Sequence, residues 1–435
     1  MTVCAIDTTR TAATAPFTIS ADGSYAARLA GHGEALYAER WTLAGPEAYA
    51  VPLPLAQPEE ADSELLPLAD GRVLIHRRVA ERHAFALLYP TGAAAGPRTG
   101  ELQLGWLAAQ EGVRVRLLPP SPEGSAAFAL AVADGQSTVW QVAGGGCAGP
   151  RPVARIPGRC SGGVWLDRTG RMLALDRERD GVTKAVAVDL WAGGGDGVCP
   201  LLQIAEGSDD RLLLADADSG LLLIRSDAPG EARLGWGVLG SALPVRFPEC
   251  LRAQGLAQAV PFAVQPGQAL MPESCGVALR LPGDGLALWR PADRHVFRVG
   301  PPVGWLGGTG LWSREGRLHL PYATPEAPCG ILGMSVPVAP PPPVRPDPPV
   351  RLDPPPAAAR PVPLQQALGG RPRGAAAQEA PGARPRGAAA AGPSRPAPAP
   401  SAPPAAVPRR VVGSSPCVPW TAGAVSLSFH RTSRA

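Results

Sequence analysis

The chain of 435 residues lacks any long run of apolar residues. No segment approaches the length of about 18 consecutive apolar residues that marks a membrane-spanning helix. The N-terminal residues, Met1 to Asp7, do not combine a basic segment with an apolar one, as an export signal does. We therefore expect a cytoplasmic protein that does not contact a membrane.

Lysine is almost absent, because 40 of the 41 basic residues are arginine and Lys184 is the single exception. This bias is typical of a GC-rich bacterial coding sequence and does not require selection for guanidinium groups. The abundance of arginine therefore does not by itself indicate a protein that binds nucleic acid. Aromatic residues are also scarce, at 5% of the chain.

Patterns that indicate metals or disulfides are missing as well. The eight cysteines have no C-x-x-C spacing, and we expect them to be reduced and buried as small apolar side chains. Cys147 and Cys160 are close in sequence, but nothing indicates a bond between them. The segment Asp216 to Gly220 lacks most positions of a calcium-binding loop and is better explained as a hairpin turn. The sequence therefore predicts neither a metal nor a cofactor.

Proline and glycine, in contrast, are abundant, with 53 and 52 residues. Proline, alanine and arginine dominate residues 337–410, which we predict to be a disordered linker or tail with polyproline II character. Residues 411–435 form a short segment of unknown structure. From Val336 onward, 12 arginines face three acidic residues, so this part carries a charge of +9 and the remainder −5.

The basic tail suggests two kinds of partner. Its arginines have no interleaved aromatic residues, which favours weak, salt-sensitive contact with polyanions. Segments such as Pro346 to Pro349 have the P-x-x-P spacing that binds aromatic grooves on proteins.

Before Val336, one short phrase recurs, in which a small or polar residue and an acidic residue or Thr precede Gly and an apolar run. Each copy predicts a tight turn that leads into a strand, and recurrence at a regular period is typical of repeat architectures. The copies end at Gly23, Gly71, Gly124, Gly170 and Gly316.

Short apolar segments between these turns can be assigned to seven groups of strands, with almost no helical periodicity. The absence of crossover helices excludes a parallel α/β sheet. We predict an all-β protein, a six- or seven-bladed β-propeller over residues 1–336. The strand Thr2 to Asp7 is expected to close the last blade beside Ile331 to Val336, which removes exposed sheet edges. Phe247 to Met271 fits worst and is interpreted as a helical or looped insertion between the fifth and sixth blades.

The phrase also carries a resemblance to a known family. Ser20 to Gly23 and Ser121 to Gly124 each precede an apolar strand and then a strand bearing Trp41 or Trp140. This arrangement resembles the Ser-Pro-Asp-Gly repeats of WD40-like, TolB-type propellers over residues 15–335. Such blades also form the propeller half of prolyl-oligopeptidase-type serine peptidases. No G-x-S-x-G string occurs and no α/β segment follows Val336, so we do not expect the hydrolase half of that family.

Four residues are candidates for a ligand-binding site. His76 and His83 lie at adjoining strand ends of the second blade, where they are interpreted as surface residues or, alternatively, as a metal or catalytic pair. Trp305 and Trp312 lie in a glycine-rich stretch and are candidates for a ligand-facing rim. Other tryptophans late in blade strands are expected to pack in the core, namely Trp41, Trp140, Trp191 and Trp289.

No convergent catalytic set is visible, so no catalytic residue is predicted. We interpret the chain as a non-enzymatic propeller that binds a protein partner or a small ligand. Two alternatives remain open, a propeller enzyme with a site in the central channel and the orphaned propeller half of a prolyl-oligopeptidase-type peptidase. Polar His, Asp and Arg residues along the channel favour an enzyme, whereas small apolar residues favour a scaffold.

Overall fold

The computed structural model describes residues 16–92, 98–146, 149–192, 197–253, 255–266 and 271–335. All of them belong to one compact unit, Met1–Arg345. These residues contain 26 β-strands and two short 3₁₀ helices, η2 (Glu249–Leu251) and η3 (Pro272–Ser274). No helix in this part of the chain has the length and apolar character needed to cross a membrane.

Four sheets have four strands each, and each sheet is an antiparallel meander in which the strands follow their order in the chain. The first two are β1 (Thr18–Ile19), β2 (Tyr25–His32), β3 (Ala35–Thr42) and β4 (Tyr49–Leu53), and β5 (Glu64–Pro67), β6 (Val73–Val79), β7 (Arg82–Thr91) and β8 (Arg98–Ala108). The other two are β9 (Arg114–Leu117), β10 (Ala127–Ala133), β11 (Gln136–Ala143) and β12 (Arg151–Pro157), and β20 (Val260–Val264), β21 (Val277–Leu281), β22 (Gly285–Trp289) and β23 (Phe297–Val299).

The two remaining sheets differ in size. A seven-stranded sheet contains two meanders, which a single parallel bridge between Lys184 and Asp210 connects. Its strands are β13 (Arg159–Trp165), β14 (Met172–Arg179), β15 (Val182–Asp189), β16 (Val198–Pro200), β17 (Asp210–Ala215), β18 (Leu221–Ser226) and β19 (Arg233–Val238). The last sheet has three strands, β24 (Leu311–Trp312), β25 (Arg317–Tyr322) and β26 (Gly330–Ser335).

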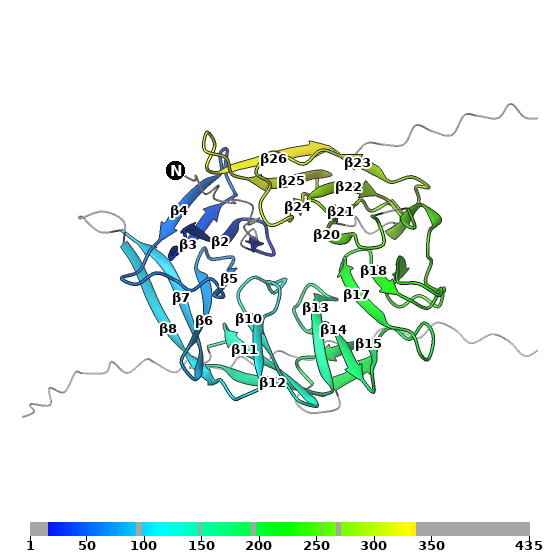
Figure 1. Ribbon diagram of the computed structural model, residues 1–435, viewed down its shortest axis with the longest axis horizontal. Helices are drawn as coiled ribbons and strands as arrows, with labels where there is room; N and C mark the ends of the chain where they lie inside the picture. The colour runs from blue at the N-terminus through cyan, green and yellow to red at the C-terminus, as the bar shows by residue number, and fades with distance from the viewer. Residues whose placement is uncertain are drawn as a thin grey trace, which may run out of the picture. The chain divides into compact units, whose positions relative to one another are not determined.

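The sheets follow one another around a common centre, and the labelled first strands β5, β13, β17, β20 and β24 lie on the side of their meanders that faces it (Figure 1). Five of the sheets in the described part of the chain have four or more strands. The described residues therefore form an all-β propeller.

The core lies between neighbouring sheets, so both faces of a central strand are buried. In β6, Leu74 packs with Ala129 of the next sheet, whereas the adjacent Ile75 packs with Ala27 of the previous one. Successive side chains of a strand point to opposite faces. Burial on both faces explains why the middle strands are continuous apolar runs and do not alternate apolar and polar residues.

The recurring turn phrase connects the first strand of a meander to the second. Gly23, for example, has a φ of +74°, which glycine adopts readily, and its N–H donates to the Ser20 carbonyl at 2.9 Å. A Cβ placed on Gly23 lies 2.1 Å from a methyl carbon of Leu311 in the last sheet. Likewise, a Cβ on Gly124 lies 2.5 Å from Ala69 in the preceding sheet. The positive φ of the turn therefore favours glycine at both positions, and at Gly124 the close approach of Ala69 requires it as well.

The structure corrects one prediction from the sequence, confirms a second and leaves others untested. Phe247 to Met271 is not simply an insertion, because β20 within it is the first strand of a sheet. The segment Asp216 to Gly220 is the turn between β17 and β18, as predicted. The strand predicted at Thr2 to Asp7, the Pro-rich segment 337–410 and residues 411–435 lie outside the described residues.

The expected burial of tryptophan and cysteine holds only in part. Trp41 and Trp289 are buried, at 0% and 1% exposure, but Trp191 is 64% exposed, so the prediction of core packing was wrong there. Its indole lies against the Arg171 guanidinium, 5.8 Å from the ring centroid. Cys160 is buried and Cys199 is exposed, while Cys147 lies outside the described residues.

Candidate functional site

The first strands of the meanders surround a cavity with a volume of ≈ 700 Å³, which we call the central cavity. Strands β1, β5, β9, β13, β17, β20 and β24 all contribute residues to its wall. Pockets of roughly 300–1,000 Å³ are typical of sites for small ligands. The cavity is therefore the candidate binding site of the propeller.

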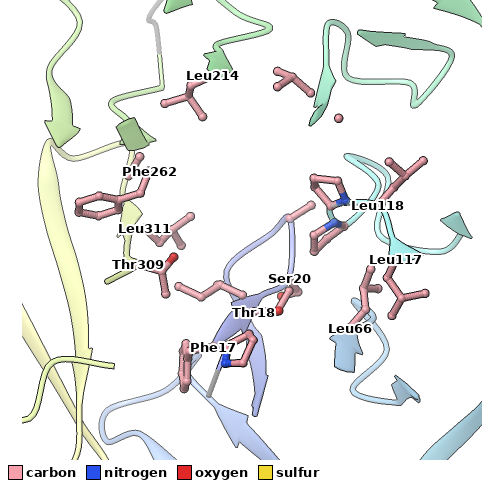
Figure 2. A pocket seen from close by; sticks show the side chains of 18 of the residues that line it. Phe17, Thr18, Ser20, Leu66, Leu117, Leu118, Leu214, Phe262, Thr309 and Leu311 are labelled. Atoms are coloured by element: carbon pink, nitrogen blue, oxygen red, sulfur yellow. The ribbon is translucent and has the colours of Figure 1, made fainter. Parts of the chain in front are cut away.

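Most of the side chains that line the central cavity are apolar. In Figure 2, Leu117 and Leu118 lie across the open space from Phe262 and Leu311, and Leu214 lies at another side of the same space. Hydroxyl groups are contributed by Thr18, Ser20, Ser63 and Thr309. Among the described residues of the wall, only Glu64 and Arg116 are charged.

Glu64 begins β5, and its carboxylate connects two neighbouring sheets. The backbone N–H of Leu117 in β9 donates to Glu64 Oε2 at 2.7 Å. His76 in β6 pairs with Glu64 across the sheet, and its Nδ1 lies 3.0 Å from the same oxygen. The Glu64 side chain retains 39% of its exposure, whereas that of His76 retains 6%. One carboxylate oxygen is thus fixed from two directions while the side chain still reaches the cavity.

His83 in β7 extends this network into the sheet. His83 Nδ1 lies 2.9 Å from His76 Nε2, and both residues are only 5% exposed. If His76 Nδ1–H donates to Glu64, His76 Nε2 accepts the hydrogen bond from His83 Nδ1–H. Burial lowers the pKa of His83, nearby His76 and Arg78 lower it further, and Glu64 opposes this effect. The surface interpretation of the two histidines was therefore wrong, because they form a buried pair behind a residue of the cavity wall.

Arg116 in β9 is the other charged residue of the wall. Its guanidinium donates to the carbonyl of Gly162, where β13 has a bulge between Ser161 and Val164. Burial lowers the pKa of Arg116, although Glu64 and Asp176 act against this. Arg116 thus already interacts with protein groups on neighbouring sheets.

Asp176 in β14 lies behind the wall and is 5% exposed. Burial raises its pKa to about 6, although the N–H of Leu212, which donates to Oδ1 at 2.9 Å, and the arginines Arg211 and Arg116 oppose the increase. Like Glu64, Asp176 accepts a hydrogen bond from the first strand of another meander. Asp176 does not line the cavity, so we assign it to the structure and not to the site.

Asp210 at the start of β17 forms a second carboxylate network and is fully buried, at 0% exposure. Lys184 Nζ and the N–H of Ile204 donate to Oδ2 at 2.7 and 2.9 Å. The hydroxyls of Ser208 and Ser226 reach Oδ1 at 2.9 and 2.6 Å. Burial acts to raise the pKa of Asp210, but these hydrogen bonds hold it below its usual range. The only lysine of the chain therefore compensates a buried charge at the junction of two meanders.

The two candidate tryptophans differ in position. Trp312 in β24 lines the central cavity and is 2% exposed. Trp305 does not belong to the described cavity wall, and its Nε1–H donates to the Thr309 carbonyl at 2.8 Å. The structure thus brings Trp312, but neither Trp305 nor the two histidines, to the wall itself. A role of these residues in ligand binding stays a prediction.

Sequence reasoning missed Glu64 and Arg116 because it did not assign β5 and β9 as strands. Both strands have only four residues, and Arg114 to Leu117 alternates arginine with apolar residues. That alternation was the available signal. Within the described ranges, no group of three or more His, Cys, Asp or Glu residues could hold a metal ion.

The sequence matches no family model and no curated protein. Solved structures that it resembles include TolB from Acinetobacter baumannii, with 11% identity, a TM-score of 0.37 and coverage of 72% of this chain and 81% of that one. The propeller domain of the Trilobed protease from Pyrococcus furiosus has 11% identity and a TM-score of 0.44, with coverage of 74% and 95%. An acylaminoacyl peptidase has 11% identity and a TM-score of 0.43, and the match covers 74% of this chain but only 51% of the peptidase. The β-propeller that the sheets of this chain form is similar to TolB and to the propeller domains of prolyl-oligopeptidase and acylaminoacyl-peptidase proteins.

Proposed function

We propose that this protein is a non-enzymatic β-propeller that binds a ligand or a protein partner by enclosing an apolar group of it in the central cavity. The observation that supports this proposal is the composition of the wall, in which apolar side chains predominate and Glu64 and Arg116 are the charged residues described. A mostly apolar cavity with a few fixed polar groups is typical of binding sites.

The arrangement of titratable groups favours binding over catalysis. An enzyme needs a nucleophile or a general acid–base pair that reaches the bound substrate. His76 and His83 are hydrogen-bonded to each other behind the wall, and Asp176 is also behind it. The two histidines bind each other and Glu64 within one sheet, and Asp176 accepts from Leu212 of another meander, so the enzyme alternative gains no support from their positions.

The proposal can be tested with the full-length protein and an environment-sensitive apolar fluorescent dye. Leu214 lines the cavity, so Leu214→Gln places a polar amide in the wall at little change in size. We expect the dye affinity to fall about tenfold, the order expected when part of a buried leucine contact is lost. Leu243→Gln is the matched control, because Leu243 is 64% exposed and lies outside this cavity.

Two results would overturn the proposal. One is dye binding that is unchanged in Leu214→Gln, since the central cavity is then not the binding site. The other is turnover of a peptide, ester, lactone or glycoside that the Leu214→Gln variant loses and the Leu243→Gln variant retains. That result replaces a binding module by a propeller enzyme.

We also propose that the propeller has seven blades. The four four-stranded sheets, the two meanders of the seven-stranded sheet and the three-stranded sheet together make seven. The last sheet has one strand fewer than the four-stranded ones, which supports the proposal that Thr2 to Asp7 adds a strand beside β26. Removal of residues 1–10 should then lower the melting temperature, whereas removal of residues 411–435 should not. Equal melting temperatures of the first variant and the full chain would contradict the closure.

A further inference from the structure

Glu64 gives the central cavity a fixed acceptor at one point of an otherwise apolar wall. We propose that the ligand of the cavity carries a protonated amine on an apolar chain, and that Glu64 Oε1 binds the amine. The inference rests on the proposed function and adds the chemical class of the ligand. It is carried by the geometry of the carboxylate and by the character of the surrounding wall.

The two oxygens of Glu64 have different surroundings. Leu117 N–H and His76 Nδ1 both reach Oε2, at 2.7 and 3.0 Å. No group in the described part of the chain donates to Oε1, although 39% of the side chain is exposed. The open oxygen therefore belongs to a carboxylate whose other oxygen is already fixed, and a donor on the ligand can bind it without reorganising the side chain.

The network behind Glu64 holds this orientation. His76 stacks on Phe85 with a centroid separation of 5.1 Å, and His83 hydrogen-bonds its other ring nitrogen. His76 is therefore a positioning residue that fixes the carboxylate from one sheet, while Leu117 fixes it from the next. A charge-assisted hydrogen bond to a fixed carboxylate is roughly twice as strong as a neutral one.

The apolar wall selects the rest of the ligand. Leu117 is the next residue along the wall from Arg116 and lies with Leu118 opposite Phe262 and Leu311 (Figure 2). Alkyl or aromatic groups gain about 25 cal/mol for each Å² that such a surface buries. A ligand with both an ammonium group and an apolar chain uses the two features of the cavity together.

Arg116 does not provide an equivalent site for an anion. Its guanidinium donates to the Gly162 carbonyl and lies in the field of Glu64 and Asp176. Both hydrogen bonds of Glu64 go to Oε2, so its Oε1 accepts none from the described residues. The open charged group of the wall is thus the carboxylate, which binds a cation.

Three probes of equal chain length test the inference: octylamine, octanol and octanoate. Binding to the full-length protein can be measured by isothermal titration calorimetry at about pH 7.5, where an alkylamine is protonated. We expect octylamine to bind at least tenfold more tightly than octanol, and octanoate to bind most weakly. The order reports the sign of the charge that the wall prefers.

Three variants locate the effect. Glu64→Gln should reduce the affinity for octylamine to that for octanol and leave octanol unchanged, which also shows that the variant is folded. His76→Gln should reduce the ratio of the two affinities about threefold, because the carboxylate remains but loses one anchor. Glu111→Gln, at an exposed turn residue away from the cavity, should change neither affinity.

The failure of this inference is distinguishable from that of the proposed function. Equal binding of octylamine and octanol, tighter binding of octanoate, or an amine preference that persists in Glu64→Gln contradicts the inference while the cavity still binds apolar compounds. Absence of binding by all three probes, together with dye binding unaffected by Leu214→Gln, contradicts the proposed function as well.

Discussion

Glu64 and Asp210 are both carboxylates at the start of the first strand of a meander, yet their surroundings differ. Asp210 has 0% exposure, and four donors reach its two oxygens. Glu64 keeps 39% of its side-chain exposure, and its two hydrogen bonds go to one oxygen. A carboxylate with all its positions occupied serves the fold, whereas one with an open oxygen in a cavity is available to a ligand.

The junctions explain the difference. At Asp210 the two meanders are joined by a bridge to Lys184, which brings a cation to the carboxylate. At Glu64 the hydrogen bond from the neighbouring strand β9 comes from a backbone N–H, while Arg116 of that strand donates to Gly162, and the wall opens into the cavity. The comparison predicts that substitution at Asp210 affects stability most and that substitution at Glu64 affects binding most.

The largest expected effect is that of Asp210→Asn. This change leaves the Lys184 ammonium, which is 16% exposed, without its counter-charge. We expect the free energy of unfolding to fall by about 3–5 kcal/mol, as when one partner of a buried ion pair is removed. Urea denaturation measures the change, and Asp134→Asn at an exposed turn should stay within about 0.5 kcal/mol of the parent protein. A loss below about 1 kcal/mol for Asp210→Asn contradicts a structural role for the network.

Asp176→Asn should have the next largest effect on the free energy of unfolding, which it should increase. Burial raises the pKa of Asp176 to about 6, so the folded protein holds its proton at a pH where the unfolded chain has lost it. Stability therefore falls as the pH rises from about 4 to about 6, and the folded protein carries the cost of the buried charge above that range.

The asparagine variant should remove this dependence. At neutral pH we expect the free energy of unfolding of this variant to be about 2 kcal/mol higher than that of the parent protein. This holds provided that the amide oxygen of the asparagine accepts the hydrogen bond from Leu212 N–H. Urea denaturation between about pH 4 and 8 measures both slopes. If the free energy of unfolding depends on pH in the same way in the variant and the parent protein, Asp176 does not cause the dependence.

Glu64→Gln is expected to change stability less, by about 1 kcal/mol, because a half-exposed amide replaces a half-exposed carboxylate and can still accept from Leu117 N–H. Its larger effect should be the loss of the preference for octylamine. Thermal denaturation and calorimetric titration of the same preparation separate the two effects. If Glu64→Gln loses as much stability as Asp210→Asn and keeps the preference for octylamine, Glu64 serves the fold and not the binding site.

The smallest expected effect concerns the pH dependence contributed by His83. Burial lowers the pKa of His83, as do His76 and Arg78, while Glu64 opposes them. The unfolded chain then binds a proton more readily than the folded protein, so stability falls as the pH drops below about 6.5. His83→Gln should reduce this loss at acidic pH, measured by urea denaturation. If the loss of stability at low pH is the same in His83→Gln as in the parent protein, His83 does not cause it.

Much of the architecture could be predicted from local sequence. The turn phrase identifies connections between first and second strands, because the glycine conformation and the capping side chain are local properties. The middle strands are continuous apolar runs, as in Val73 to Ile75, since both faces are buried. Short first strands such as β1 and β9 were missed because two to four residues carry too little pattern.

The candidate site could be predicted only in fragments. His76 and His83 were identified as a pair near each other, but their burial and their connection to Glu64 were not. The contact of Glu64 with Leu117 spans 53 residues and depends on the packing of two sheets. Trp191 was misplaced for the same kind of reason, because its exposure depends on which strand ends meet solvent.

The sequence by itself determined that this chain is a repeat of short antiparallel strands, because turn chemistry and apolar runs act over a few residues. Only the tertiary structure decided which carboxylate is enclosed and which one faces a cavity. Asp210 and Glu64 each begin a short strand, and two donors to Asp210, Ile204 N–H and the Ser208 hydroxyl, are close to it in sequence. The rest of the distinction arises from groups that are distant in sequence, Lys184 and Ser226 at Asp210 and an open apolar wall at Glu64.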